Sequence, residues 1–280
     1  DALAASESSY GPEHPASAYF LSAWAETLYS FAGEEEALPL HRRALAIYRA
    51  RLGEAHPRTR GSQSSLIKRL VGQERYDEAE PLLRRLLVVE EGALGAGAFE
   101  SAVSLDMLAG ILRQTGRMDE ATAALARAYA ITVKAVGADH LMAVSAHEAW
   151  VGMIDRAGDA AQAEALYRRH LAEREASLGP DHRMVARSAM ALARLLDGER
   201  REDEAEALYQ RVLGIYRQTS GEDAREAVDV RFRLARLLEG QGRYAEAEAE
   251  FRRVLAADEA NHVAGAPAIV RFVGGTVADA

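Results

Sequence analysis

The sequence predicts an all-α solenoid of about six tandem helix-turn-helix repeats, and two independent spacings support this fold class. Six glycines recur at intervals of 42 residues: Gly11, Gly53, Gly95, Gly137, Gly179 and Gly221. Six alanines recur at the same interval in a second register: Ala37, Ala79, Ala121, Ala163, Ala205 and Ala247. Self-similarity at a fixed period of about 20–50 residues is typical of solenoid repeats. Two registers that hold over six copies without an insertion are not expected by chance.

Each repeat is predicted to contain two helices. In the last repeat the first helix is expected over about 225–239, where apolar residues form one stripe at three- and four-residue spacing. The segment 240–243 contains two glycines and interrupts this pattern. A second helix is expected over about 245–257. In earlier repeats the second helix is predicted to end at the periodic glycine, because glycine enters the left-handed conformation without a steric penalty.

The periodic alanine has a packing explanation. Where the two helices of one repeat cross, a small side chain allows their axes to approach to about 8–10 Å. Pro39 and Pro81 each follow this alanine by two residues. Both prolines are therefore expected near the first turn of a second helix, where a missing N–H group costs least.

These residues resemble a known repeat family. In the last repeat the pattern comprises Leu234, Leu238, the turn Gly242-Arg243-Tyr244, Ala247 and Phe251. It resembles the tetratricopeptide repeat (TPR), and the 42-residue period is similar to the longer variant found in kinesin light chains. Linkers such as Gly179-Pro180-Asp181-His182 fit that variant. The resemblance covers roughly residues 2–258. It implies a right-handed solenoid whose first helices line a concave groove that binds peptides or helices.

The two ends of the chain differ in register. Ala2-Leu3-Ala4 stands 42 residues before Ala44-Leu45-Ala46, so residues 1–10 are interpreted as the end of a helix from a preceding repeat. Residues 11–258 then form the six repeats, and we expect the chain to be a fragment of a longer protein. Continuing the register beyond 258 would place Gly274-Gly275 inside a helix, at about 1 kcal/mol for each glycine. Residues 259–280 are therefore expected to form a C-terminal cap or a flexible exit segment.

Composition excludes several functions. The net charge is −9, which argues against binding to nucleic acid or to an anionic membrane, because both require a basic surface. The chain has no cysteine, so disulfides, thiolate nucleophiles and cysteine-bound zinc are excluded. Lys68 and Lys134 are the only lysines and Asn261 is the only asparagine, which suggests a GC-rich bacterial genome. We expect a cytoplasmic protein.

No group of residues predicts catalysis, a cofactor or a metal ion. His147-Glu148 resembles the start of a zinc-protease motif, but position 151 is valine and the second histidine is missing. Four histidines recur at one repeat position: His14, His56, His140 and His182. Equivalent helices in a solenoid lie on the order of 10 Å apart, whereas zinc–nitrogen bonds are about 2.0–2.1 Å long. These histidines are therefore predicted to cap the linkers.

Charged residues also follow the repeat. Carboxylates cluster at the starts of second helices, where they favour the helix dipole. Arginine pairs recur in the same helices: Arg42-Arg43, Arg84-Arg85, Arg168-Arg169 and Arg252-Arg253. We predict that they form ion pairs between repeats on a solvated face. Trp24 and Trp150 share one position of the first helix and are predicted to belong to the core.

The candidate binding residues follow from the implied groove. Positions 15, 11 and 8 residues before each periodic alanine lie opposite the apolar stripe of the first helix. The candidates on or close to these positions are Tyr29, Lys68, Arg113, Arg187, Met190, Arg194, Phe232 and Arg236. The three arginines toward the C-terminal end flank Met190 and Phe232, which fits an acidic or carboxylate-bearing segment with one large apolar side chain. Alternatively, these three arginines pair with nearby acids, namely Asp197, Asp229 and Glu239.

The sequence therefore predicts a non-enzymatic scaffold that binds a protein or peptide through the concave face. Chaperone-binding members of the family and kinesin light chains use asparagines in the groove, and this chain has none within its repeats. We therefore do not expect this chain to bind the ligands of those proteins. Two alternatives are a regulatory or sensor arm of a larger protein, with a linked NTPase or caspase-like protease as partner domain, and a self-assembly module.

Overall fold

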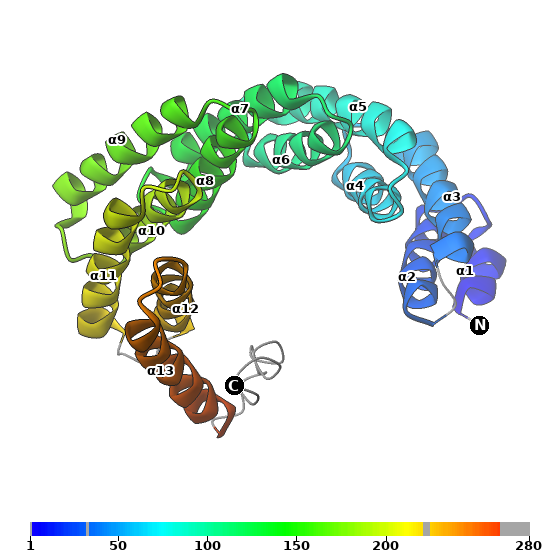
Figure 1. The fold of residues 1–280 in the computed structure, drawn as a ribbon. Helices are drawn as coiled ribbons and strands as arrows, with labels where there is room; N and C mark the ends of the chain where they lie inside the picture. Colours follow the sequence, from blue (N-terminus) through cyan, green and yellow to red (C-terminus); the bar gives the residue numbers. More distant parts are fainter. Residues whose placement is uncertain (1, 32–33, 221–224, 264–280) are drawn as a thin grey trace. The chain divides into compact units, whose positions relative to one another are not determined.

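A computed structural model describes residues 2–31, 34–220 and 225–263 (Figure 1). In these ranges the chain forms thirteen helices and no strand, which confirms the predicted all-α solenoid of helix-turn-helix repeats. The helices are α1 (Ala2–Tyr10), α2 (Pro15–Phe31), α3 (Glu34–Leu52), α4 (Pro57–Gly72), α5 (Tyr76–Leu94), α6 (Phe99–Gln114), α7 (Met118–Val136), α8 (Leu141–Arg156), α9 (Ala160–Leu178), α10 (Arg183–Gly198), α11 (Glu202–Thr219), α12 (Arg225–Gly240) and α13 (Tyr244–Val263).

The helices belong to two compact units, Asp1–Met153 and Ile154–Ala280, here called unit 1 and unit 2. In unit 1 each helix packs on the next from α1 to α7, and in unit 2 the same holds from α9 to α13. Helices α12 and α13 begin within one residue of the starts expected from the sequence, which were 225 and 245. Helix α13 continues past residue 258 to Val263, and the segment 264–280 lies outside the described residues.

The core is built around the periodic alanines. Ala79, Ala121, Ala163 and Ala205 have no exposed surface, as expected where two helices approach closely. The prediction for the two tryptophans holds for only one of them. Trp150 packs against the core of unit 1 and stacks on Tyr129, with ring centroids 5.6 Å apart.

Trp24 is 51% exposed, so its predicted place in the core is wrong. The position that corresponds to Tyr129 three repeats earlier is Leu3. Trp24 therefore has no equivalent ring to stack on, and its large indole projects into solvent.

The linkers confirm two further predictions. The described periodic glycines have φ between 83° and 93°, the left-handed conformation, and they follow the second helices. Gly221 lies outside the described residues. In four linkers the histidine Nδ1 accepts a hydrogen bond of 3.1–3.2 Å from the backbone N–H two residues later. These histidines are His14, His56, His140 and His182.

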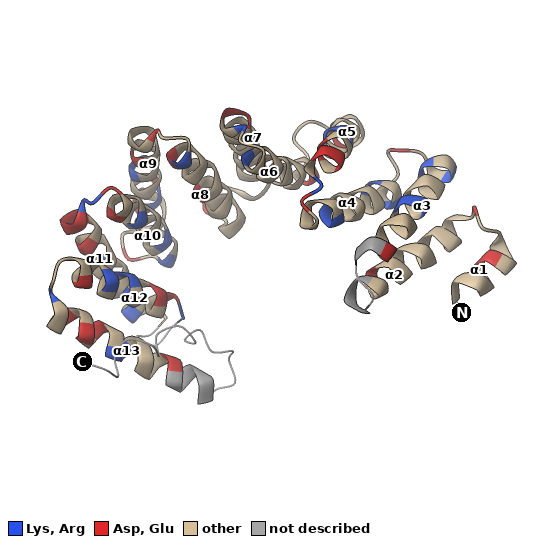
Figure 2. Cartoon of the chain, turned by 45° about the vertical axis from the view of Figure 1, so that its right-hand side comes forward, with Lys and Arg blue, Asp and Glu red and all other residues tan. Residues whose placement is uncertain are grey.

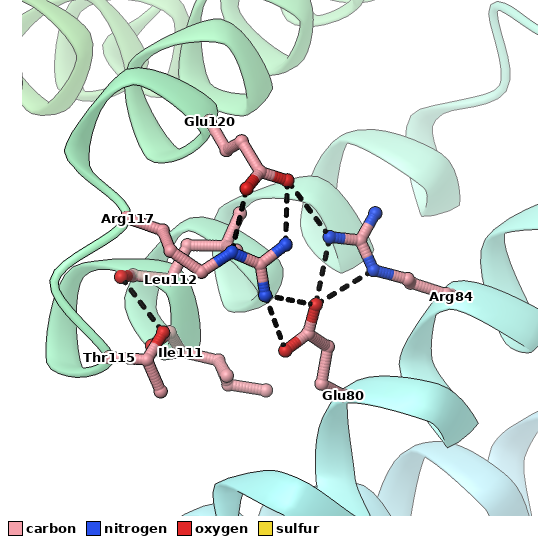
Figure 3. A network of polar contacts seen from close by, with 7 residues as sticks. All are labelled: Glu80, Arg84, Ile111, Leu112, Thr115, Arg117 and Glu120. Carbon is pink, nitrogen blue, oxygen red and sulfur yellow. Dashed lines mark hydrogen bonds and ion pairs between the residues drawn. The ribbon is translucent and has the colours of Figure 1, made fainter.

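The predicted ion pairs between repeats also form, and they belong to a larger network (Figure 3). Arg84 of α5 bonds to Glu80 of its own helix at 2.8 Å and to Glu120 of α7 at 3.2 Å. Arg117, just before α7, reaches back to Glu80 at 2.8 Å and binds Glu120 at 2.6 Å. Two arginines and two glutamates thus join neighbouring second helices.

The same four-residue network occurs in unit 2, two repeats later. Glu164, Arg168, Arg201 and Glu204 repeat its contacts at 2.6–2.9 Å. The recurring arginines within the second helices, such as Arg84 and Arg168, were predicted from the sequence to form ion pairs between repeats. Glu80 and Glu164 were not identified, nor were the arginines that precede α7 and α11. Glu80 and Glu164, like Arg117 and Arg201, stand two repeat periods apart, which is the signal that could have revealed them.

One buried carboxyl group is less well satisfied. Glu90 of α5 is only 6% exposed, and its Oε2 has no hydrogen-bond partner among the described residues. Burial raises the pKa of Glu90, and a hydrogen bond with Ser104 and the positive charge of Arg60 offset this effect only in part. The charged form of Glu90 therefore destabilises the fold.

We expect Glu80→Gln to lower the free energy of unfolding by about 1 kcal/mol at pH 7, because two arginines lose a charge-assisted partner. Burial would raise the pKa of Glu80, but hydrogen bonds from Arg84 and Arg117 lower it overall. The stabilisation is thus present above the ordinary value of 4.5 and is lost as the pH falls through the lower pKa of the folded state. Urea unfolding followed by circular dichroism measures this loss. Glu120→Gln, at a carboxylate that is 52% exposed against 17% for Glu80, should cost less. Equal losses would contradict this ranking.

We expect Glu90→Gln to raise the free energy of unfolding by about 1 kcal/mol at pH 7, because the amide avoids the cost of a buried charge. Since the pKa of Glu90 is raised in the folded state, this gain should disappear below the ordinary value of 4.5, where the carboxyl is protonated in both states. Unfolding curves at pH 4 and pH 7 test both points. A loss of stability at pH 7 would mean that the charge of Arg60 outweighs desolvation.

Candidate functional site

Each unit has a hollow between two first helices, lined in addition by the second helix between them. In unit 1 the hollow lies between α6 and α8 and has a volume of about 520 Å³. Its lining residues are Phe99, Ala102, Val103, Asp106, Leu125, Ala128, Thr132, Leu141, Met142, Ser145, Ala146 and Ala149. In unit 2 the hollow lies between α10 and α12 and has a volume of about 310 Å³. Its lining residues are Arg187, Met190, Tyr216, Arg225, Glu226, Asp229 and Val230.

The two hollows occupy equivalent places in the repeats. Every lining residue of the unit 2 hollow stands two repeat periods after a lining residue of the unit 1 hollow. Val103 thus corresponds to Arg187, and Thr132 corresponds to Tyr216. A similar arrangement of helices therefore presents two different sets of side chains.

The unit 2 hollow is strongly charged. Arg187 and Arg225 contribute positive charge, and Met190 contributes an apolar side chain. Its two acids pair with arginines that do not line the hollow. Glu226 binds Arg183 at 2.6 Å, and Asp229 binds Arg233 at 3.2 Å. Arginines outside the lining therefore partly neutralise the charges of Glu226 and Asp229. Arg187 and Arg225 belong to the lining itself.

The structure brings together the three predicted residues of α10. Arg187 and Met190 line the hollow, and Arg194 lies one helical turn after Met190. Arg194 is exposed, and none of the described residues forms a hydrogen bond or ion pair with it. The alternative pairing of Arg194 with Asp197 does not form. Asp197 instead accepts a hydrogen bond from the hydroxyl of Tyr209 at 3.3 Å.

The two predicted residues of α12 are more constrained. Arg236 pairs with Glu239 at 2.8 Å, as the alternative interpretation expected. Phe232 meets the ring of Phe251 edge to face at 5.9 Å and packs against a small core cluster that contains Val254. Neither residue lines the unit 2 hollow.

The predicted residues of unit 1 are not concentrated at its hollow. Tyr29 belongs to α2, but its side chain lies outside the described part of the structure. Lys68 of α4 and Arg113 of α6 are exposed, and neither lines the unit 1 hollow.

The apolar character of the unit 1 hollow was not predicted from the sequence. Val103, Leu141 and Met142 are 48%, 53% and 43% exposed. They lie 18 to 22 residues before the periodic alanine, whereas the candidate positions were mainly those 8 to 15 residues before it. Counting back one more helical turn would have found Val103, and a second turn would have found Leu141 and Met142. Asp106 is the only charged lining residue, and burial raises the pKa of its carboxyl group.

The described residues contain no group of three or more histidine or carboxylate side chains that could hold a metal ion. Among the described helices, none combines the length and the apolar character needed to cross a membrane.

Two tetratricopeptide repeat models match the sequence. One matches residues 141–218 and 199–260, and the other matches residues 22–58 and 101–141. Among proteins with curated descriptions, none has a sequence that matches significantly.

Two solved structures have a similar fold. A Podospora anserina protein described as a kinesin light chain with nearly identical TPR-like repeats has a TM-score of 0.63 at 22% identity. That match covers 74% of this chain and 99% of the other. BtubC (BKLC) from P. vanneervenii has a TM-score of 0.57 at 18% identity, covering 95% of this chain and 97% of the other. At these identities the likeness concerns the fold. The family matches show that the chain belongs to the tetratricopeptide repeat family, and its 42-residue helix pairs share the fold of these structures.

Proposed function

We propose that the chain is a non-enzymatic scaffold whose unit 2 binds an acidic segment of a protein partner on the face formed by α10 and α12. The tetratricopeptide fold suggests a scaffold for protein–protein interaction, and the family is generally non-catalytic. The observation that carries the proposal is the grouping of Arg187, Met190 and Arg194 along one face of α10, at the unit 2 hollow.

The spacing of these residues supports a shared binding face. Arg187, Met190 and Arg194 are separated by three and four residues, so their side chains follow one another along the same side of the helix. Arg225 adds a further guanidinium from α12, on the other side of the hollow. A guanidinium can bind a carboxylate through two parallel hydrogen bonds, which favours acidic side chains or a chain terminus as ligand.

The apolar component comes from Met190. An unbranched thioether side chain adapts its shape to different apolar groups. The hollow of about 310 Å³ is at the lower end of the range for ligand sites. It is therefore suited to one large side chain, with carboxylates on either side meeting the arginines of α10 and α12.

Arg194 contributes most clearly to recognition. An arginine that already holds a carboxylate must give up that bond to bind a ligand. Arg236 is in this position, because it pairs with Glu239. Arg194 has no such partner among the described residues, so a ligand carboxylate would add an ion pair without breaking one.

The proposal is tested with two fluorescein-labelled twelve-residue peptides that share a central leucine and differ only in four glutamates or four glutamines. We expect the parent chain to bind the glutamate peptide at least about tenfold more tightly in fluorescence anisotropy, since each charged hydrogen bond contributes about 1.5–3 kcal/mol. The double variant Arg187→Glu, Arg194→Glu should lose this preference, because like charges then face the peptide.

The matched control is Arg169→Glu with Arg252→Glu, which makes the same change in net charge at two exposed residues of unit 2 that line neither hollow. It should retain the preference, and circular dichroism should show equal helicity in all three proteins. An equal loss in the control would mean that net charge alone attracts the peptide. Unchanged binding by the double variant would place the site elsewhere.

A further inference from the structure

The unit 1 hollow reverses the chemistry of its unit 2 counterpart at four equivalent positions. Three apolar residues of unit 1 replace charged residues of unit 2, and one acid replaces an apolar residue. The pairs are Val103 and Arg187, Leu141 and Arg225, Met142 and Glu226, and Asp106 and Met190. In Figure 2, α8 is mostly tan, whereas α10, α11 and α12 carry many blue and red residues. A ligand suited to one hollow is therefore poorly suited to the other.

The apolar surface of the unit 1 hollow is open to solvent. Val103 of α6 and Leu141 and Met142 of α8 are each close to half exposed. Phe99 and Ala146 extend the lining between them, and the hollow measures about 520 Å³. Contiguous exposed apolar surface of this kind is typical of an interaction site, because its burial by a partner is favourable.

The charge of this hollow selects for a cation. Asp106 is its only charged lining residue, and none of the described residues forms an ion pair with its carboxylate. Arg113, the candidate cation of α6, lies two turns after Asp106 and does not line the hollow.

Desolvation makes the carboxylate of Asp106 a better partner for such a cation. Asp106 is exposed, but neighbouring side chains of the hollow partly desolvate its carboxyl group and raise its pKa. A lysine or arginine brought by a ligand would supply the missing positive charge in a partly apolar setting, where a charge pair is stronger than in open water.

We propose that the unit 1 hollow binds a basic, apolar protein segment, in which a lysine or arginine adjoins a large aliphatic or aromatic side chain. The cation meets Asp106, and the apolar side chain covers Val103, Leu141 and Met142. This proposal shares with the proposed function only the premise that the chain binds proteins. It does not require that unit 2 binds acidic segments.

The test uses three fluorescein-labelled twelve-residue peptides with the full chain. The first contains two phenylalanines and two arginines, the second has glutamates in place of the arginines, and the third has serines in place of the phenylalanines. We expect the first to bind the parent at least about tenfold more tightly than the third. In the double variant Val103→Arg, Asp106→Met, unit 1 carries the unit 2 residues, and the affinity for the first peptide should fall at least about tenfold.

The reciprocal variant Arg187→Val, Met190→Asp is the matched control. This control leaves the unit 1 hollow intact, so it should not abolish binding of the first peptide. Only the variant of unit 1 removes the proposed site, and that variant should therefore reduce the binding. The isosteric single change Asp106→Asn, at an exposed residue, is a second probe that leaves the packing intact. It should weaken the binding of the first peptide several-fold and should not weaken that of the second, whose glutamates lose a repulsive neighbour.

Three results would overturn the proposal. The first is no saturable binding of the arginine–phenylalanine peptide up to about 1 mM, a concentration that corresponds to only weak affinity. The second is equal binding by the parent and by Val103→Arg, Asp106→Met. The third is a dimer in light scattering that this variant abolishes, because a second copy would then be the occupant. If the affinity for the glutamate peptide is the same in the parent and in the Arg187→Glu, Arg194→Glu variant, only the function proposed for unit 2 is contradicted.

Discussion

The close approach of two helices at each periodic alanine is the constraint on which the rest of the structure depends. Ala79, Ala121, Ala163 and Ala205 are completely buried, and any larger side chain at these positions would push the helices apart. Because the crossing recurs every 42 residues, equivalent residues of different repeats occupy equivalent places. The identical contacts of the two networks around Arg117 and Arg201 follow directly from this regularity.

The same regularity separates residues that build the fold from residues that can recognise a ligand. On the second helices, the arginines at 84 and 168 are engaged by two glutamates each, so they stabilise the array and are not available to a partner. On the first helices, Arg194 has no such partner among the described residues. Arg236, also on a first helix, pairs with Glu239, so the local neighbours and not the helix decide whether an arginine is engaged.

The sequence predicted most of the fold because the deciding residues are local and periodic. The glycines, alanines and linker histidines act through their own backbone or through one neighbouring helix, and each was found where its spacing placed it. The failures involve contacts that spacing alone does not determine. Trp24 shares its position with the packed Trp150, yet Leu3 cannot stack on it. The unit 1 hollow was missed because its exposed apolar residues lie one to two turns before the helix positions that the family resemblance indicated.

The net charge of −9 describes the local electrostatics of neither hollow. At physiological ionic strength, exposed charges more than about 8 Å apart are largely screened from one another. A ligand in a hollow therefore responds mainly to the few side chains that line it and to their immediate partners. In unit 2 those partners neutralise Glu226 and Asp229 and leave arginines in the lining, while in unit 1 the lining contains one acid and no cation. The acidic segment proposed for unit 2 and the basic segment proposed for unit 1 are therefore both compatible with the net charge of −9. Substitutions at a few exposed positions are sufficient for this difference, because the buried alanines keep the underlying helix packing the same.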